Sequence, residues 1–215
     1  MLCLAAAGLG CLLCLPVVSR AAWQTTTIAT ATGTFQDVTI TAGRDGSSAW
    51  YVYAASGDDY LHEYAWNGSG WSGGQIGSSA SVALEGVAAG DARDNGQMRL
   101  FGFAVDGYVY EYYHNGSTWS STQLSSAGDS FNRGTAGPGR DNGAADLYGA
   151  NTNGEIYEYH WDGGGYAVNA LDDPPGSEVY DVAVGDGRND GTDRVYAVSD
   201  DNRVWEYTYN AGSWT

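Results

Sequence analysis

Four short segments decide the fold of this chain: His62-Glu63-Tyr64, Tyr110-Glu111-Tyr112, Tyr157-Glu158-Tyr159 and Trp205-Glu206-Tyr207. Each one places a ring, a glutamate and a tyrosine in the same order. The glutamates recur at positions 63, 111, 158 and 206, in nearly equal steps. A repeat of about this length that is built from several short strands is typical of a β-propeller blade.

Each repeat has the same parts, and together they predict four antiparallel strands. A short apolar strand is followed by a polar loop and then by a second strand. The Glu-Tyr segment is the third strand, and turns such as Asp106-Gly107 and Asn115-Gly116 lie on either side of it. Such Asx-Gly pairs between aromatic strands are strong hairpin signals. We therefore predict an all-β propeller of four four-stranded blades of about 48 residues, at approximately 35–80, 81–128, 129–176 and 177–215.

The ends of the chain leave the closure of the ring open. Trp23 lies one repeat length before Trp71, so Trp23 to Thr32, within 23–34, reads as a fourth strand without a blade of its own. This strand could complete the last blade and remove free sheet edges. However, Trp214 would then duplicate Trp23. The alternative is a truncated or partial propeller, which could complete itself as a homo-oligomer.

The first residues differ from the rest of the chain. Leu2 to Val18 is an apolar run that ends in Ser19-Arg20-Ala21, which predicts a signal peptide at 1–21 and a propeller domain at 22–215. A membrane anchor is the alternative, although the run is short for a membrane span. We expect a secreted or cell-surface protein with no membrane segment after cleavage. All three cysteines lie in this run, so the remaining chain has no disulfide and no thiolate metal site.

The composition favours an acidic all-β protein. The 215 residues include 32 glycines, 16 tyrosines and 8 tryptophans, and the formal net charge is −17. Glycine allows tight turns, and aromatic residues suit pleated surfaces. Nucleic acid is not an expected partner, because phosphates would be repelled. The acidity is explained by the charge of a soluble extracellular surface, with cation binding as the alternative.

The recurring glutamate is the main candidate for chemistry. A carboxylate in the middle of an aromatic strand is costly to bury without a partner, and arginine opens the second strand at Arg99 and Arg194. A recurring salt bridge inside each blade is one interpretation. A sugar pocket is the other, because charged groups can bind hydroxyls while an indole stacks on the C–H face of a sugar ring.

One stretch of the fourth repeat resembles a known family. Asp193-Arg194-Val195-Tyr196, Asp201-Asn202-Arg203-Val204-Trp205-Glu206-Tyr207 and Trp214 are similar to a blade of the fungal fucose-binding lectins, which are six-bladed propellers. More generally, the chain resembles repeat-built bacterial propeller lectins. In the fungal family, an Arg and a Glu of a blade, with a nearby aromatic residue, hold fucose between blades.

The resemblance implies sugar-binding residues in each repeat. The best matches to the motif are Arg99, Glu111 and Trp119 in the second repeat, and Arg194, Glu206 and Trp214 in the fourth. The first repeat has Trp50 in place of the arginine, and the third has Asp146. Glu63, Trp71, Glu158 and Tyr166 are therefore the weaker candidates.

The polar loop after the first strand is a second recurring feature. It carries an arginine at Arg44, Arg93, Arg140 and Arg188. In the fourth repeat, 185–191 is rich in Asp and Asn, as calcium loops are. We favour a structural Asx turn, because an arginine recurs where a ligand should be. We expect each arginine to pair with a carboxylate or carbonyl of its own or the next blade, and we expect neither a metal nor a cofactor.

The repeats favour a binding protein over an enzyme. The three histidines do not share a repeat position, and we find no nucleophile, zinc or phosphate-loop motif. We expect a non-catalytic lectin-like propeller that binds glycans, with fucose-like monosaccharides among the candidates. The alternative is an interaction or surface scaffold without a sugar site, and a propeller enzyme that acts on glycans ranks third.

Overall fold

The computed structural model describes residues 25–30, 33–42, 44, 49–77, 83–124, 131–140, 142–151, 153–171 and 178–215. The described residues form strands, turns and bends, and none of them is helical. The predicted signal peptide and Trp23 lie outside the described residues. Among those described there is no helix long and apolar enough to cross a membrane.

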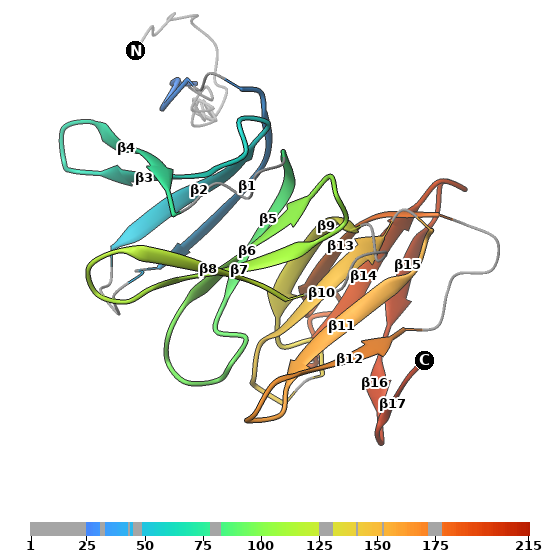
Figure 1. The fold of residues 1–215 in the computed structure, drawn as a ribbon. Coiled ribbons are helices and arrows are strands. Elements are labelled where there is room, and N and C mark those ends of the chain that lie inside the picture. Colours follow the sequence, from blue (N-terminus) through green and yellow to red (C-terminus); the bar gives the residue numbers. More distant parts are fainter. Residues whose placement is uncertain are drawn as a thin grey trace, which may run out of the picture.

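The chain is a four-bladed β-propeller, as the sequence predicted (Figure 1). The first blade contains β1 (Phe35–Ala42), β2 (Trp50–Ser56), β3 (Leu61–Trp66) and β4 (Trp71–Ile76). The second contains β5 (Leu84–Gly90), β6 (Arg99–Ala104), β7 (Val109–His114) and β8 (Trp119–Gln123). The third contains β9 (Phe131–Gly137), β10 (Asp146–Asn151), β11 (Ile156–Trp161) and β12 (Tyr166–Ala170). All neighbouring strands within these sheets are antiparallel.

The fourth blade differs in its outer part. β13 (Val179–Gly185), β14 (Arg194–Ser199) and β15 (Val204–Tyr207) form a three-stranded sheet. A short hairpin of β16 (Tyr209–Asn210) and β17 (Ser213–Trp214) follows it. Tyr209 pairs with Trp214 as Trp66 pairs with Trp71 in the first blade. The hairpin therefore corresponds to the end of a third strand and the start of a fourth.

The apolar core lies between the blades as well as within them. Each of three buried clusters joins one blade to the next, and the central cluster contains Phe101 and Phe103 of the second blade with Phe131 and Leu147 of the third. The inner strands β1, β5, β9 and β13 lie side by side in that order. Burial of apolar surface between neighbours thus holds the blades in sequence.

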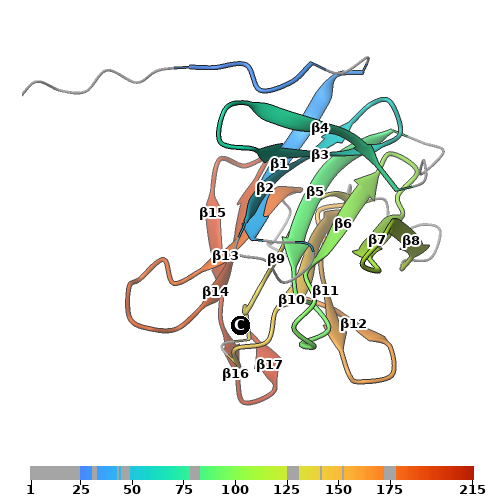
Figure 2. The ribbon, with the colours of Figure 1, turned by 90° about the vertical axis from the view of Figure 1, so that its left-hand side faces the viewer.

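The two ends of the series do not pack together as neighbouring blades do. Among the described residues, no packing like that between β1 and β5 joins β13 to β1. Of the two alternatives for the chain ends, the one in which Trp23 to Thr32 pairs with the last blade is contradicted for its described part. Residues 25–30 are not a strand, and both views show them beside the first blade (Figures 1 and 2). There, Ile28 and Ala29 line a pocket with Phe35 and Tyr64.

One glycine marks the tightest contact between the second and third blades. At Gly134 on β9, an added Cβ would overlap the Phe103 ring and the backbone oxygen of Tyr148. Neither neighbour can move easily, because Phe103 is fully buried and Tyr148 belongs to the adjacent strand. Glycine is therefore required at this position for steric reasons.

We predict that Gly134→Ala lowers the free energy of unfolding by about 2 kcal/mol or more, because it overpacks the contact between blades. Gly185→Ala is the matched control, since Gly185 also lies on an inner strand and a Cβ there would meet nothing within 4 Å. Urea denaturation measures both variants. Equal midpoints for the two variants would contradict the steric argument.

Candidate functional site

Each recurring glutamate forms an ion pair with the loop arginine of its own blade. The pairs are Arg44–Glu63, Arg93–Glu111, Arg140–Glu158 and Arg188–Glu206. In the last three, Nε and a terminal nitrogen bind the two carboxylate oxygens, which is the bidentate geometry that arginine favours. The prediction that the loop arginines pair with carboxylates is confirmed.

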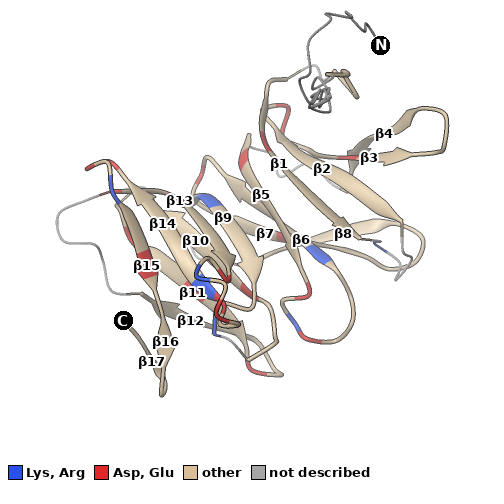
Figure 3. Ribbon diagram, turned by 180° about the vertical axis from the view of Figure 1, so that it is seen from behind, with Lys and Arg blue, Asp and Glu red and all other residues tan. Residues whose placement is uncertain are grey.

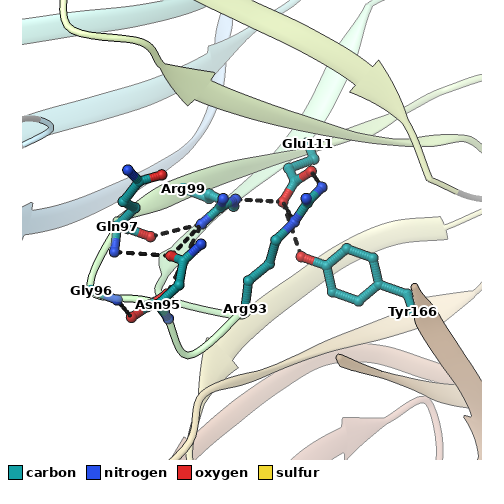
Figure 4. Close-up of polar contacts among 8 residues, drawn as sticks. Arg93, Asn95, Gly96, Gln97, Arg99, Glu111 and Tyr166 are labelled. Atoms are coloured by element: carbon teal, nitrogen blue, oxygen red, sulfur yellow. Dashed lines mark hydrogen bonds and ion pairs between the residues drawn. The ribbon is translucent and has the colours of Figure 1, made fainter. Parts of the chain in front are cut away.

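The second blade surrounds its glutamate most completely (Figure 4). Arg93 Nε donates to Glu111 Oε1 at 2.9 Å, and Arg99 Nε lies 2.8 Å from the same oxygen. The Tyr166 hydroxyl, from the third blade, donates to that oxygen at 3.0 Å. Glu111 is fully buried. Its carboxylate is thus held by two arginines and by a tyrosine of the neighbouring blade.

A tyrosine hydroxyl binds the glutamate in the first three blades, but the strand that supplies this tyrosine is not the same in each. Tyr53 donates to Glu63 Oε2 at 3.1 Å, and Tyr148 donates to Glu158 Oε1 at 3.2 Å. Burial, together with the nearby carboxylate, raises the pKa of both tyrosines, so both stay protonated as donors. The second blade has Phe101 at this position, opposite Glu111. Tyr166 of the next blade supplies the missing hydroxyl.

The aromatic residue that opens each fourth strand faces the preceding blade. Trp119 packs edge-on against Tyr53 of the first blade, and Trp214 packs edge-on against Tyr148 of the third. The sequence grouped Glu111 with Trp119 and Glu206 with Trp214, each within one repeat. In the structure, the aromatic partner of Glu111 is Tyr166, and Trp214 lies beside the carboxylate site of the third blade.

One of these inter-blade sites opens into a pocket. A cavity of about 550 Å³ lies between the third blade and the terminal hairpin of the fourth. Its polar lining comes from Arg140, Glu158, His160 and Asn169, and its aromatic lining comes from Tyr209 and Trp214. Two candidates from the sequence, Glu158 and Trp214, therefore meet here although they belong to different repeats.

The polar groups of this pocket are held in place by one another. Asn169 Nδ2 donates to Glu158 Oε2 at 3.2 Å, and Arg140 Nη1 donates to the Tyr209 hydroxyl at 3.2 Å. The Arg140 guanidinium also lies 4.6 Å from the centre of the Tyr209 ring. Such a set offers fixed donors and acceptors beside aromatic faces, which suits a small polar ligand that also has an apolar face.

A buried acid lies behind the pocket. Asp146 Oδ1 lies 2.8 Å from His160 Nδ1, and this aspartate occupies the position of Arg99 and Arg194 in the other blades. Burial raises the pKa of Asp146, while the hydrogen bond to His160 opposes the rise. The third repeat thus replaces an arginine with an aspartate–histidine pair.

In the fourth blade Arg194 and Trp214 are buried, and only Glu206 of the predicted residues is partly exposed. Arg194 Nε lies 3.9 Å from Glu206 Oε1, while the guanidinium of Arg194 donates two hydrogen bonds of 2.9 Å to Asp190. Arg188 binds Glu206 from the loop, and its hydrogen bonds lower the pKa of Glu206. The Arg188 side chain is exposed to solvent, and the Glu206 side chain is partly exposed. No further blade covers them among the described residues.

The remaining candidates lie in the first blade. Glu63 is buried and paired with Arg44. Trp71 lines a cavity of about 560 Å³ with His62, Asp58 and Gln75, and residues 28–30 form one side of it. His62 Nε2 lies 3.1 Å from each Asp58 oxygen. Asp58 lies in the turn before β3 and thus contacts the His62 side chain of that strand.

The acidic loops are hydrogen-bonded turns, as expected. Asp91 accepts hydrogen bonds from the backbone nitrogens of Asn95 and Gly96, and Asp186 accepts them from Asp190 and Gly191. Figure 3 shows that the acidic residues are spread over several strands and loops. In the described part of the chain, no three Asp, Glu, His or Cys side chains gather as a metal site would require.

Comparisons with known proteins support the fold. No protein-family model matches the chain, and no curated protein matches it. Its structure is similar to the WD40 β-propeller domain of Doa1, with a TM-score of 0.57, 14% identity and 84% of this chain covered. It is also similar to the lectin of Aleuria aurantia, described as a six-bladed propeller with a novel mode of fucose recognition, with a TM-score of 0.51, 20% identity and 87% covered.

A further structure of that lectin, the N224Q mutant in complex with α-methyl-L-fucoside, matches with a TM-score of 0.50 and 20% identity over 83% of this chain. This chain spans 54% of the Doa1 structure and 59–62% of the two lectin structures. The chains it resembles are thus longer, and they include a lectin and a WD40 β-propeller domain. At these identities, the likeness shows the fold alone.

Sequence reasoning missed several residues of the pocket. It assigned Arg140 a structural role only, and it did not select His160, Asn169 or Tyr209. Arg140 and Tyr209 could have been found as a recurring pair, because Arg93 lies 4.3 Å from the Trp161 ring in the same way as Arg140 approaches Tyr209. His160 and Asn169 have no recurring signal, because they are specific to the third repeat.

We predict different costs for two equivalent arginines. Arg140→Ala leaves the buried carboxylate of Glu158 without its guanidinium, so we expect a loss of about 3 kcal/mol in the free energy of unfolding. Arg188→Ala breaks an exposed pair, so we expect little change in melting temperature. Urea and thermal denaturation measure both. A large effect at Arg188 with none at Arg140 would contradict the burial argument.

We also predict an acid-dependent contribution from Asp190. Its hydrogen bonds with Arg194 lower the pKa of Asp190 from the ordinary 3.8 to about 2. The pKa of Asp190 is lower in the folded than in the unfolded chain. The free energy of unfolding that Asp190 contributes is therefore complete above pH ~4 and is lost as the pH falls toward 2. Asp190→Asn should therefore be less stable than the wild type at pH 7 and equally stable near pH 2. A gap that does not change between these pH values would exclude this linkage.

Proposed function

We propose that this chain is an exported, non-catalytic carbohydrate-binding propeller that holds a sugar in the pocket between its third and fourth blades. The observation that carries the proposal is the pocket itself, where Arg140, Glu158 and Asn169 lie beside the rings of Tyr209 and Trp214. The export of the chain rests on its apolar N-terminal run, and its place of action would be secreted or at the cell surface.

The pocket offers what a monosaccharide needs. A sugar ring carries hydroxyls that both donate and accept, so carboxylate, amide and guanidinium groups can all bind it. Its C–H face is apolar and packs on an aromatic ring, which here is Tyr209 or Trp214. The polar groups are already fixed by mutual hydrogen bonds, so little ordering is needed on binding.

Fucose is the first ligand to test. The Aleuria aurantia lectin shares the propeller fold and is described with a fucoside bound. The blade motif of this chain resembles that of the fungal fucose-binding lectins over the same strands. These two observations together favour a fucose-like monosaccharide over other small polar ligands.

The sites selected in the sequence differ in their access. Glu111 and Glu158 are both fully buried in their hydrogen-bond networks, but Glu158 lies in the wall of a cavity that Arg140, Asn169 and Trp214 also line. Glu206 is partly exposed, but Arg194 beside it is buried. We therefore place the main site at Glu158 and Trp214. Further weak sites on other blades would increase the capture of multivalent glycans by avidity.

A scaffold role is the second candidate, and a separate observation favours it. The fold is also similar to the WD40 domain of Doa1, and the chain exposes Val38, Ile40 and Val204 at its two ends. Apolar surface of this kind is typical of faces that bind proteins. This role requires no sugar in any pocket.

We predict that the purified protein binds fucosylated glycans on a broad glycan array. Asn169→Ala should raise the dissociation constant for fucose about 5- to 10-fold in calorimetry, because the variant loses a hydrogen-bonding group of the pocket and releases Glu158 from its partner. Asn210→Ala is the matched control, because Asn210 is exposed on the same terminal hairpin and does not line the pocket.

Two results would contradict the proposal. If the folded protein binds no glycan on the array, the lectin function is wrong and the scaffold role replaces it. If Asn169→Ala and Asn210→Ala leave fucose binding equally unchanged, the sugar site lies elsewhere on the propeller.

A further inference from the structure

The outer face of the first blade is a blade interface without its neighbour. Three valines occupy equivalent positions on the inner strands of their blades: Val38, Val87 and Val182. Each pairs with the residue two places before the end of its blade's second strand. Val87 and Val182 are 3% and 6% exposed, since the preceding blade covers them. Val38 is 63% exposed, and Ile40 beside it is 60% exposed.

The opposite face of the fourth blade shows the complementary gap. The first residue of each third strand is Leu61, Val109, Ile156 or Val204. The first three are 0% exposed because the following blade covers them, but Val204 is 73% exposed. Val198 on the adjacent strand is exposed as well. Both ends of the series thus present apolar faces that every internal interface buries.

A contact between a loop arginine and an aromatic ring of the next blade recurs within the chain, and each end of the series exposes one of its two partners. The loop arginines Arg93 and Arg140 lie 4.3 and 4.6 Å from the rings of Trp161 and Tyr209 in the next blade. Trp66 holds the same position in the first blade, since it pairs with Trp71 as Trp161 pairs with Tyr166. Trp66 is 55% exposed, and the Arg188 side chain is 59% exposed.

The sheet of the fourth blade has one strand fewer than the other blades, at the same end of the series. The β13–β14–β15 sheet has three strands, whereas the other blades have four. Ile28 lies one repeat length before Ile76, the last residue of β4. Ile76 and Leu171, which follows β12, are buried at this position. Residues 25–30 therefore have the sequence of an outer strand and lie at the end of the chain's first blade.

We propose that the first blade of a second copy of this chain docks on the fourth blade, so that the copies join head to tail. The new interface repeats the three that already exist within the chain: Val38 and Ile40 cover Val198 and Val204, and Trp66 stacks on Arg188. Residues 25–30 of the second copy lie beside the incomplete outer part of the fourth blade.

The joint also completes the carboxylate site of the fourth blade. In the internal sites, the residue that opens the next fourth strand contacts the preceding blade, as Trp119 contacts Tyr53 and Trp214 contacts Tyr148. Trp71 of the second copy takes this role toward Glu206. Because the two surfaces differ, the interface is heterologous, and the copies form a ring or an open series.

The first experiment measures the mass of the full chain, expressed with its own N-terminus, by light scattering after size exclusion over a range of concentrations. The wild type should be larger than one chain and should dissociate on dilution. Val38→Asp and Val204→Asp should each abolish association, because each buries a charge in the joint. Trp66→Ala should weaken it about 5-fold. Val168→Asp is the matched control, since Val168 is exposed on an outer strand and should have no effect.

Mixing the variants tests the polarity of the joint. A Val38→Asp chain keeps an intact fourth blade, and a Val204→Asp chain keeps an intact first blade. Together they should form a one-to-one dimer and nothing larger, although each alone is a monomer. Circular dichroism of each variant confirms that it is folded.

Three outcomes would overturn the proposal. The first is a wild type that stays monomeric at every concentration. The second is association that persists in Val38→Asp and Val204→Asp. The third is a mixture of the two folded variants that remains monomeric, because this would show that the two faces do not bind each other.

Discussion

The structure depends on one interaction, the ion pair between a mid-strand glutamate and a loop arginine. A carboxylate buried between blades is costly unless a charged donor meets it. The fold meets this need by bending the loop after each inner strand so that Arg93 or Arg140 reaches back to the third strand. The pair fixes the loop, and the loop in turn places its guanidinium against an aromatic ring of the next blade.

The surroundings of these pairs differ from blade to blade. In the second blade, Arg99 and Tyr166 complete the network around Glu111, which is as fully buried as Glu158 of the third blade. In the third blade, an aspartate–histidine pair occupies the position of that second arginine. The neighbouring fourth blade has only a short terminal hairpin at its outer side. A pocket opens there. Chemical variation between repeats, more than the repeat itself, decides which site is accessible.

The ends of the series follow from the one-dimensional character of a repeat protein. Each blade contacts only its neighbours, so the first and the last keep one interface unused. The exposure of Val38 and Val204, and of Trp66 and Arg188, is a direct result. The proposed heterologous contact between copies would satisfy both ends with surfaces of the kind that the chain already uses internally.

The sequence by itself determined the blade number, the strand order and the recurrence of a loop arginine that needs an acceptor, because these features recur in every repeat and each repeat folds by the same local rules. That the acceptor is the mid-strand glutamate of the same blade was decided by the tertiary structure. It could not decide which aromatic residue meets which glutamate, because Trp119 and Trp214 cross to the preceding blade and spacing within a repeat does not reveal contacts between repeats. The burial of Glu111, the pocket at Glu158 and the position of residues 25–30 were likewise decided only by tertiary packing. They depend on how neighbouring blades cover one another, a property of the assembled sheets and not of any single repeat.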